Sequence, residues 1–301
     1  MERFTTVARG PFTLANANRY FGGWPTLASD PTALAMAFPI EDWGASAAAV
    51  VRQLPDGEIV GEVTTDGDAA RAWHTALAAL SLDVDGSAFP HVGERDPVIG
   101  RLQEQFDFAR PVCFHTPYEA ASAFVIGHRL SIAQTRALRS KLAAEHGDAL
   151  SVDGQTWHAF PRPSVVLELD SFGPVAGEKM ERLHGIAHAA LEGRLDRQRL
   201  RAMDYEMALA DLRTLRGVGP FIAQGTVIRG AGLTDEVADD EITQQAIQQA
   251  YGLPAVPTHN DIQRIAEPWR PFRTWCSVLL HMWLRHEGRS FRPSGGTRRA
   301  R

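Results

Sequence analysis

The chain has 301 residues, of which 44% are hydrophobic and 22% are charged, a composition typical of a soluble globular protein long enough for two domains. Its two cysteines exclude a disulfide framework and a four-cysteine metal centre such as an iron–sulfur cluster. The net charge of −5 weighs mildly against a polyanionic partner, so contact with one must rely on locally concentrated positive charge.

The first 110 residues are predicted to form a small α+β domain. Short apolar runs at 35–40 and 58–63 are separated by glycine and proline turns such as 55–57, a pattern typical of antiparallel strands. The alanine-rich stretch 68–79 predicts one helix among these strands.

Residues 111–289 are predicted to form a second domain made only of α-helices. Thr116 and Ser131 each precede a Glu or Gln at the third helical position, Glu119 and Gln134, which is the pattern of a capping box. Further helices are predicted at 177–191, 204–215, 220–230, 241–251 and 271–286.

The last segment, 290–301, contains four arginines and no acidic residue, and is predicted to be a flexible basic tail. The sequence shows neither a secretory leader pattern nor an apolar run of about 18 residues. We therefore expect a cytoplasmic location.

The stretch 215–223 carries two glycines, Gly217 and Gly219, between two helical patterns. Glycine permits positive φ and leaves no side chain in the way, so backbone N–H groups at the start of the second helix can face a phosphate. Such a turn holds a nucleic-acid backbone without reading its sequence. An ordinary helix C-cap followed by a turn would give the same glycine spacing.

The residues of this stretch spell a more specific pattern. They read LRGVGPFIA, which resembles the helix-hairpin-helix signature of the base-excision DNA glycosylase superfamily, and the run 238–240, ADD, resembles that superfamily's catalytic aspartate loop. The phrases at 81–86, 96–100, 110–114 and 266–275 resemble the 3-methyladenine DNA glycosylase II family, the AlkA type. The resemblance covers about residues 10–288. The chain lacks the cysteines that hold the iron–sulfur cluster of the endonuclease III relatives.

The resemblance implies that Asp240 is the catalytic residue. Breaking the N-glycosidic bond of a damaged base places positive charge on the sugar, and a nearby ionised carboxylate stabilises that charge and positions the attacking water. Asp235 and Glu241 are alternatives on spacing alone. Asp239 and Asp240 would also suit a second role, as caps of the helix that begins near residue 241.

Two aromatic residues are implied to hold the flipped base. Bifunctional members of the superfamily carry a lysine two residues after the second glycine, but this chain has Phe221 there, which predicts a monofunctional enzyme that leaves the strand intact. Trp283 lies where the resemblance places a stacking tryptophan, and aromatic faces attract electron-poor alkylated purines. A tryptophan that simply fills the core of an amphipathic helix is the alternative.

Three positions depart from the family pattern. His128 stands where the AlkA type has glutamine, Arg129 where it has an apolar wedge, and Gly225 where it has tyrosine. His128 is expected to donate a hydrogen bond to a base, Arg129 to intercalate or hold a phosphate, and Gly225 to widen the pocket. A solvated histidine and a solvated arginine are the alternatives. The expected DNA-binding residues are Arg129, Arg216, Gly217, Val218 and Gly219.

The resemblance also implies a monovalent cation, Na⁺ or K⁺, on the backbone carbonyls of Arg213, Leu215 and Val218. The expected partner is duplex DNA with damaged bases, bound by a monomer. Two rival hypotheses are a non-catalytic DNA-binding paralogue and a glycosylase for deaminated or oxidised bases.

Overall fold

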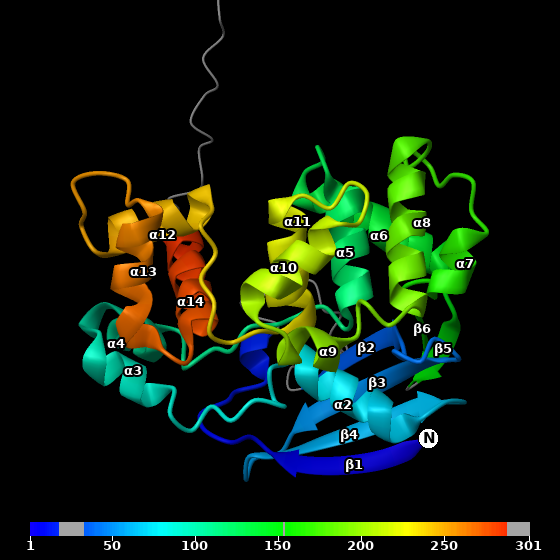
Figure 1. Cartoon of the computed structure of the whole chain (residues 1–301). Helices are drawn as coiled ribbons and strands as arrows, with labels where there is room; N and C mark the ends of the chain where they lie inside the picture. The colour runs from blue at the N-terminus through cyan, green and yellow to red at the C-terminus, as the bar shows by residue number, and fades with distance from the viewer. Residues whose placement is uncertain (18–32, 153, 288–301) are drawn as a thin grey trace, which may run out of the picture. The chain divides into compact units, whose positions relative to one another are not determined.

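The structure is a computed structural model that describes residues 1–17, 33–152 and 154–287 (Figure 1). Its contacts divide the chain into two compact units, each built from two segments. Unit 1 comprises Met1–Gly86 and Arg110–Leu233, and unit 2 comprises Ser87–Ala109 and the chain from Thr234 onward. This grouping differs from the predicted division into 1–110 and 111–289, because contacts join the N-terminal sheet to the helices that follow residue 110.

The sheet of unit 1 has four antiparallel strands in the order β1-β4-β3-β2. They are β1 (Glu2–Val7), β2 (Ala33–Pro39), β3 (Ser46–Gln53) and β4 (Glu58–Thr65), followed by helix α2 (Ala69–Ala79). In β2, alanines alternate with Leu34, Met36 and Phe38, and these three large side chains share a core with α2. The α+β fold class and the two predicted strands are confirmed, whereas β1 and β3 were not predicted.

Helix α2 packs closely on the sheet because strand β4 has a glycine, Gly61, where the Trp73 ring of α2 contacts it. An ideal Cβ on Gly61 would lie 2.1 Å from the ring of Trp73, a distance that no real contact allows. The same ring stacks on Phe4 of β1, with 5.8 Å between ring centroids. Gly61 is therefore required for the close approach of helix and sheet.

A second sheet, of two strands, corrects the prediction that everything after residue 110 is helical. Strands β5 (Ala149–Val152) and β6 (Gln155–His158) form a hairpin. Val152, Leu150 and Trp157 pack on the alanine face of the first sheet, at Ala33 and Ala48 among others. Both faces of the four-stranded sheet are thus covered within unit 1.

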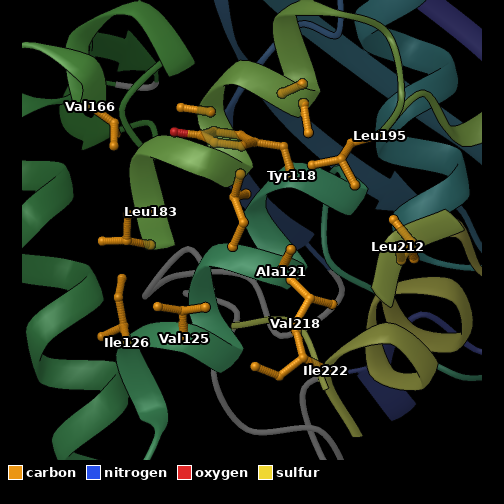
Figure 2. Packing of buried hydrophobic residues seen from close by; sticks show 14 of the residues in the cluster. Tyr118, Ala121, Val125, Ile126, Val166, Leu183, Leu195, Leu212, Val218 and Ile222 are labelled. Carbon is orange, nitrogen blue, oxygen red and sulfur yellow. The ribbon is translucent and has the colours of Figure 1, made fainter. Parts of the chain in front are cut away.

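The helical part of unit 1 surrounds the cluster of apolar side chains shown in Figure 2. Its helices are α5 (Pro117–Gly127), α6 (Ile132–His146), α7 (Pro163–Leu167), α8 (Glu178–Leu191), α9 (Arg197–Ala202), α10 (Tyr205–Arg213), α11 (Pro220–Gly225) and the π-helix η1 (Thr226–Ala231). This cluster includes Val125 of α5, Leu183 of α8, Val218 of the turn before α11, and Ile222 of α11. The predicted helices agree with these bounds to within about two residues.

Only one of the two predicted capping boxes forms in full. Ser131 and Gln134 exchange both hydrogen bonds at the start of α6. Thr116 accepts a hydrogen bond from the backbone N–H of Glu119, but the Glu119 carboxylate bonds His115 and Arg139 instead of returning to the cap. The predicted start of α5 is therefore confirmed, whereas the predicted hydrogen bond from the Glu119 side chain to the N-cap is wrong.

The regular secondary structure in the described residues of unit 2 is helical. It contains α3 (Pro90–Arg95), α4 (Pro97–Gln105), α12 (Glu241–Ala250), α13 (His259–Ala266), the 3₁₀ turn η2 (Glu267–Trp269) and α14 (Arg273–His286). Asp96 joins its two segments. One carboxylate oxygen caps α4 at Val98 and Ile99, and the other accepts hydrogen bonds from Tyr251 (2.5 Å) and Trp269 (2.8 Å).

Burial raises the pKa of the Tyr251 hydroxyl, and the Asp96 carboxylate raises it further, so this hydroxyl stays a hydrogen-bond donor. The predicted basic tail, 290–301, lies outside the described residues. Within the described part of the chain, no helix is long and apolar enough to span a membrane.

Candidate nucleic-acid interface and active site

The glycine turn predicted within 215–223 joins α10 to α11 in unit 1. Asp204 caps α10 by accepting hydrogen bonds from the N–H groups of Glu206 and Met207. The turn itself is closed by a hydrogen bond of 3.0 Å from the Val218 N–H to the Leu215 carbonyl. Val218 is only 6% exposed and packs beside Ile222, so the turn is anchored in the core (Figure 2).

The two glycines of the turn serve different purposes. Gly217 has φ of +79°, in the left-handed region, and an ideal Cβ there would lie 2.4 Å from Cδ of Arg182. Gly219 has extended backbone and is the N-cap of α11, and an ideal Cβ there would meet no atom within 4 Å. Gly217 is therefore needed to form the turn, whereas Gly219 leaves open space in front of the backbone N–H groups.

We expect Gly217→Ala to lower the free energy of unfolding by about 1–3 kcal/mol, because it combines a left-handed backbone with a steric clash. Gly219→Ala is the matched control and should cost less than about 1 kcal/mol. Urea unfolding of both variants measures the difference. Equal losses of stability in the two variants would contradict this account of the turn.

Charged side chains of α8 lie next to the turn. Arg216 forms an ion pair of 2.6 Å with Glu181, although its side chain is 69% exposed. Arg182, which packs on Gly217, forms an ion pair with Glu178. Arg216 is therefore partly neutralised, and a phosphate bound here would compete with Glu181 for it.

His128 and Arg129 lie in the bend between α5 and α6, and both are exposed. Arg129 has φ of +65°, which costs a non-glycine residue about 1–3 kcal/mol. Lys179 of α8 secures the bend by donating hydrogen bonds of 3.0 Å to the carbonyls of Ile126 and His128. Burial lowers the pKa of Lys179, and the nearby charge of Arg129 lowers it further.

The expectation that Gly225 widens a pocket is wrong. An ideal Cβ on Gly225 would lie 2.5 Å from the ring of Phe124, so that ring occupies the space. Phe124 in turn meets Phe221 edge to face, with 5.5 Å between centroids. Phe124 was not among the predicted site residues. The only signal for it in the sequence is a large side chain on α5 together with a glycine on α11 that leaves room for it. Phe221 itself is 64% exposed, as a residue that contacts a ligand requires.

Asp240 lies in unit 2, where it is the N-cap of α12. One of its carboxylate oxygens accepts a hydrogen bond of 2.7 Å from the Thr243 N–H. Its other oxygen makes no hydrogen bond or ion pair to the rest of the described chain. The capping role considered from sequence is thus realised, and one oxygen is left for a second role.

A chain of hydrogen-bonding contacts connects Asp240 through Thr243 to helix α14. The Thr243 hydroxyl is 3.0 Å from Nε2 of His281, which lies on α14 two residues before Trp283. Trp283 is half-buried, so it is neither a fully buried core residue nor a fully exposed one. Asp239 is occupied differently from Asp240, since its two oxygens bond Gln244 (2.9 Å) and His259 (3.1 Å).

The alternative carboxylates are less suited to catalysis. Asp235 forms ion pairs with Arg270 (2.6 Å) and Arg273 (2.9 Å), so its charge is already neutralised. Glu241 points outward from the first turn of α12 and is exposed. Among the acidic residues of this segment, Asp240 combines partial burial with an oxygen that no other described residue occupies.

The predicted cation site remains a proposal. The Leu215 carbonyl already accepts the Val218 N–H, but a carbonyl oxygen has a second lone pair that a cation can use. Arg213, whose carbonyl was also predicted as a ligand, is the last residue of α10. No cluster of His, Cys, Asp or Glu suited to a metal occurs among the described residues.

The predicted site residues thus fall into two groups, one in each unit. Unit 1 contains the turn, the 128–130 bend and Phe221, and unit 2 contains Asp240 and Trp283.

Comparison with known sequences finds no matching family model but several related proteins. The chain is 23% identical over 206 residues to a DNA-3-methyladenine glycosylase of Bacillus subtilis, covering 67% of this chain and 68% of the relative. It is 24% identical over 175 residues to an alkylbase DNA glycosidase-like protein of Schizosaccharomyces pombe, covering 55% of this chain and 77% of the relative.

Solved structures share the fold. The 3-methyladenine DNA glycosylase of Archaeoglobus fulgidus has a TM-score of 0.73 at 17% identity, covering 94% of this chain and 98% of that one. A Schizosaccharomyces pombe 3-methyladenine DNA glycosylase in complex with abasic DNA has a TM-score of 0.51 at 23% identity, covering 66% of this chain and 96% of that one. The chain is therefore similar in sequence to proteins named as 3-methyladenine and alkylbase DNA glycosylases, and it shares the fold of the solved 3-methyladenine DNA glycosylases.

Proposed function

We propose that the protein is a DNA repair glycosylase that flips alkylated purines of the 3-methyladenine type out of duplex DNA and hydrolyses the N-glycosidic bond. The relatives named as 3-methyladenine glycosylases carry this proposal. The product is an abasic site in an unbroken strand, because Phe221 stands where a Schiff-base lysine would be needed to cleave it. The partner is damaged duplex DNA, and we propose a cytoplasmic monomer.

Each predicted residue has a role in this reaction. The turn at Gly217 and Gly219 holds the DNA backbone through its N–H groups, supported by Arg216. Arg129 fills or borders the gap left by the flipped nucleotide, and His128 donates a hydrogen bond to a base. These roles agree with the exposure of His128 and Arg129.

The chemistry rests on a carboxylate and two aromatic rings. A cationic alkylated purine is a good leaving group, so it needs no general acid. Asp240 stabilises the positive charge that develops on the sugar. Phe221 and Trp283 hold the base by stacking and by the attraction between a cation and an aromatic face, worth about 0.5–2 kcal/mol for each ring.

Single-turnover base release tests this proposal with duplexes that carry 3-methyladenine, 7-methylguanine, hypoxanthine or 8-oxoguanine. We expect release of the alkylated bases, leaving strands that break only after alkali treatment. Binding of every duplex without release of any base would instead identify a DNA-binding protein without activity.

We expect Phe221→Ala to slow release of an alkylated purine about 3- to 30-fold at subsaturating enzyme, because one wall of the stack is lost. Phe221→Trp should keep most of the activity. Met207→Ala is the matched control, since Met207 and Phe221 are both 64% exposed hydrophobic residues of unit 1. The idea is wrong if the Phe221 and Met207 variants release bases equally fast.

A further inference from the structure

Unit 1 contains a pocket of about 650 Å³ that the proposed reaction does not use. Helix α6 and strand β6 line it, together with the chain just before and within the first turn of α5, and with Arg229 of η1. Its volume lies within the range of about 300–1,000 Å³ that small-molecule sites occupy.

The lining of this pocket is strongly basic. The described lining residues include three arginines, Arg136, Arg139 and Arg229, and only one carboxylate, Glu119. Glu119 is engaged by Arg139 and His115. If the histidines are counted as neutral, the three arginines and one glutamate give the lining two more positive than negative charges. In a partly enclosed pocket such an excess attracts anions more strongly than on an open surface.

Two of the three arginine side chains, Arg139 and Arg229, are held in place before any ligand arrives. The Arg139 guanidinium lies 4.9 Å from the ring centroid of Phe114. Arg229 donates a hydrogen bond of 2.8 Å from its NH2 group to the Val112 carbonyl. Fixed guanidinium groups lose little conformational entropy when they bind a phosphate.

Several donors at this pocket lack acceptors. Nε of Arg139, Nε of Arg229 and Nε1 of Trp157 are buried and make no hydrogen bond to the other described residues. Buried donors without partners are rare, and each calls for an explanation such as a bound ion or ligand. An anion in the pocket would draw these side chains into new hydrogen bonds.

We propose that this pocket binds a nucleoside monophosphate, with its phosphate on Arg136 and Arg229 and its base against Phe114 and Trp157. A phosphate monoester carries about −1.5 to −2 charges at pH 7, which matches the excess charge of the lining, whereas a diester within a strand carries only about −1. Phe114 and Trp157, two of the three Phe and Trp residues in the lining, provide faces for a planar ring. The site stands whether or not the protein releases bases.

Isothermal titration of the full-length protein with adenosine 5′-monophosphate, adenosine and inorganic phosphate tests the pocket. We expect the monophosphate to bind at least 10-fold more tightly than adenosine or phosphate alone. Arg136→Gln should weaken it at least 10-fold, and this variant should fold because Arg136 is exposed. Arg3→Gln, an exposed arginine of β1 outside the pocket, is the control and should bind as the wild type does. Equal binding of monophosphate and adenosine, or unchanged binding by the Arg136 variant, would overturn the proposal.

The phosphate monoester has two sources, a free nucleotide and the 5′ end of a DNA strand. Competition with short single strands that carry a 5′-phosphate or a 5′-hydroxyl distinguishes them. Displacement by the phosphorylated strand alone assigns the pocket to a strand end, and displacement by neither assigns it to a free nucleotide. Equal displacement by both strands would show that the monoester is not recognised, against the proposal.

Discussion

Asp240→Asn is expected to slow base release by at least about 10²–10³-fold, measured in single turnover on a duplex with an alkylated purine. The amide has the shape of the carboxylate but no charge, so it cannot stabilise the positive sugar of the transition state. Asparagine is also a good N-cap, and its oxygen can accept the Thr243 N–H as Asp240 does. Folding and DNA affinity should therefore stay close to wild type.

Two neighbouring carboxylates are the controls for this experiment. Asp239→Asn should reduce release only slightly, because Asp239 is exposed and bonds Gln244 and His259. Asp235→Asn should lower stability instead, since it removes the carboxylate that Arg270 and Arg273 share and leaves them only Glu267 and Glu236. Unchanged release by the Asp240 variant, with binding intact, would remove Asp240 from the mechanism.

The parts of the fold that local chemistry determines were predictable from the sequence. The two residues of the α6 capping box, Ser131 and Gln134, are only three apart in the sequence, and the box forms as predicted. The turn at Gly217 was predictable for the same reason, because glycine is required wherever φ is positive and the backbone is crowded. Such signals depend on residues within one or two helical turns of each other.

Contacts between distant residues could not be predicted from one sequence. The β5–β6 hairpin has strands of only four residues each, and its stability comes from packing on Ala33 and Ala48 of the first sheet. The pairing of Phe124 with Gly225 is a fit between two helices far apart in the chain. Asp96 serves both as a helix cap and as the acceptor of Tyr251 and Trp269, and only the capping role has a local pattern.

The Glu119 carboxylate combines a local partner, His115, with a distant one, Arg139, and replacing Glu119 should give the largest loss of stability. It is 4% exposed and bonds both Arg139 and His115. Removing one partner of a buried ion pair leaves the other buried charge uncompensated and costs about 3–5 kcal/mol. We expect Glu119→Ala to lower the free energy of unfolding by that amount in urea at pH 7. Glu145→Ala, an exposed glutamate of α6 with a surface ion pair, should cost less than about 1 kcal/mol.

The pH dependence of stability separates the charge of Glu119 from its packing. Burial alone would raise the pKa of this carboxyl, but the charges and hydrogen bonds of His115 and Arg139 outweigh burial and lower the pKa from 4.5 to about 2. A group whose pKa is lower in the folded state stabilises the protein above its unfolded pKa.

The contribution of the ionised Glu119 carboxylate to the free energy of unfolding, on the order of 3 kcal/mol, is therefore complete above pH 4.5 and is lost as the pH falls toward 2. The stability difference between wild type and Glu119→Gln should be largest near pH 5.5 and should narrow as the pH falls to 3. Equal stability of wild type and Glu119→Gln at every pH would mean that Glu119 stabilises unit 1 by its shape, because glutamine keeps that shape and lacks only the charge. A non-zero difference that stays constant down to pH 3 would contradict the lowered pKa of Glu119.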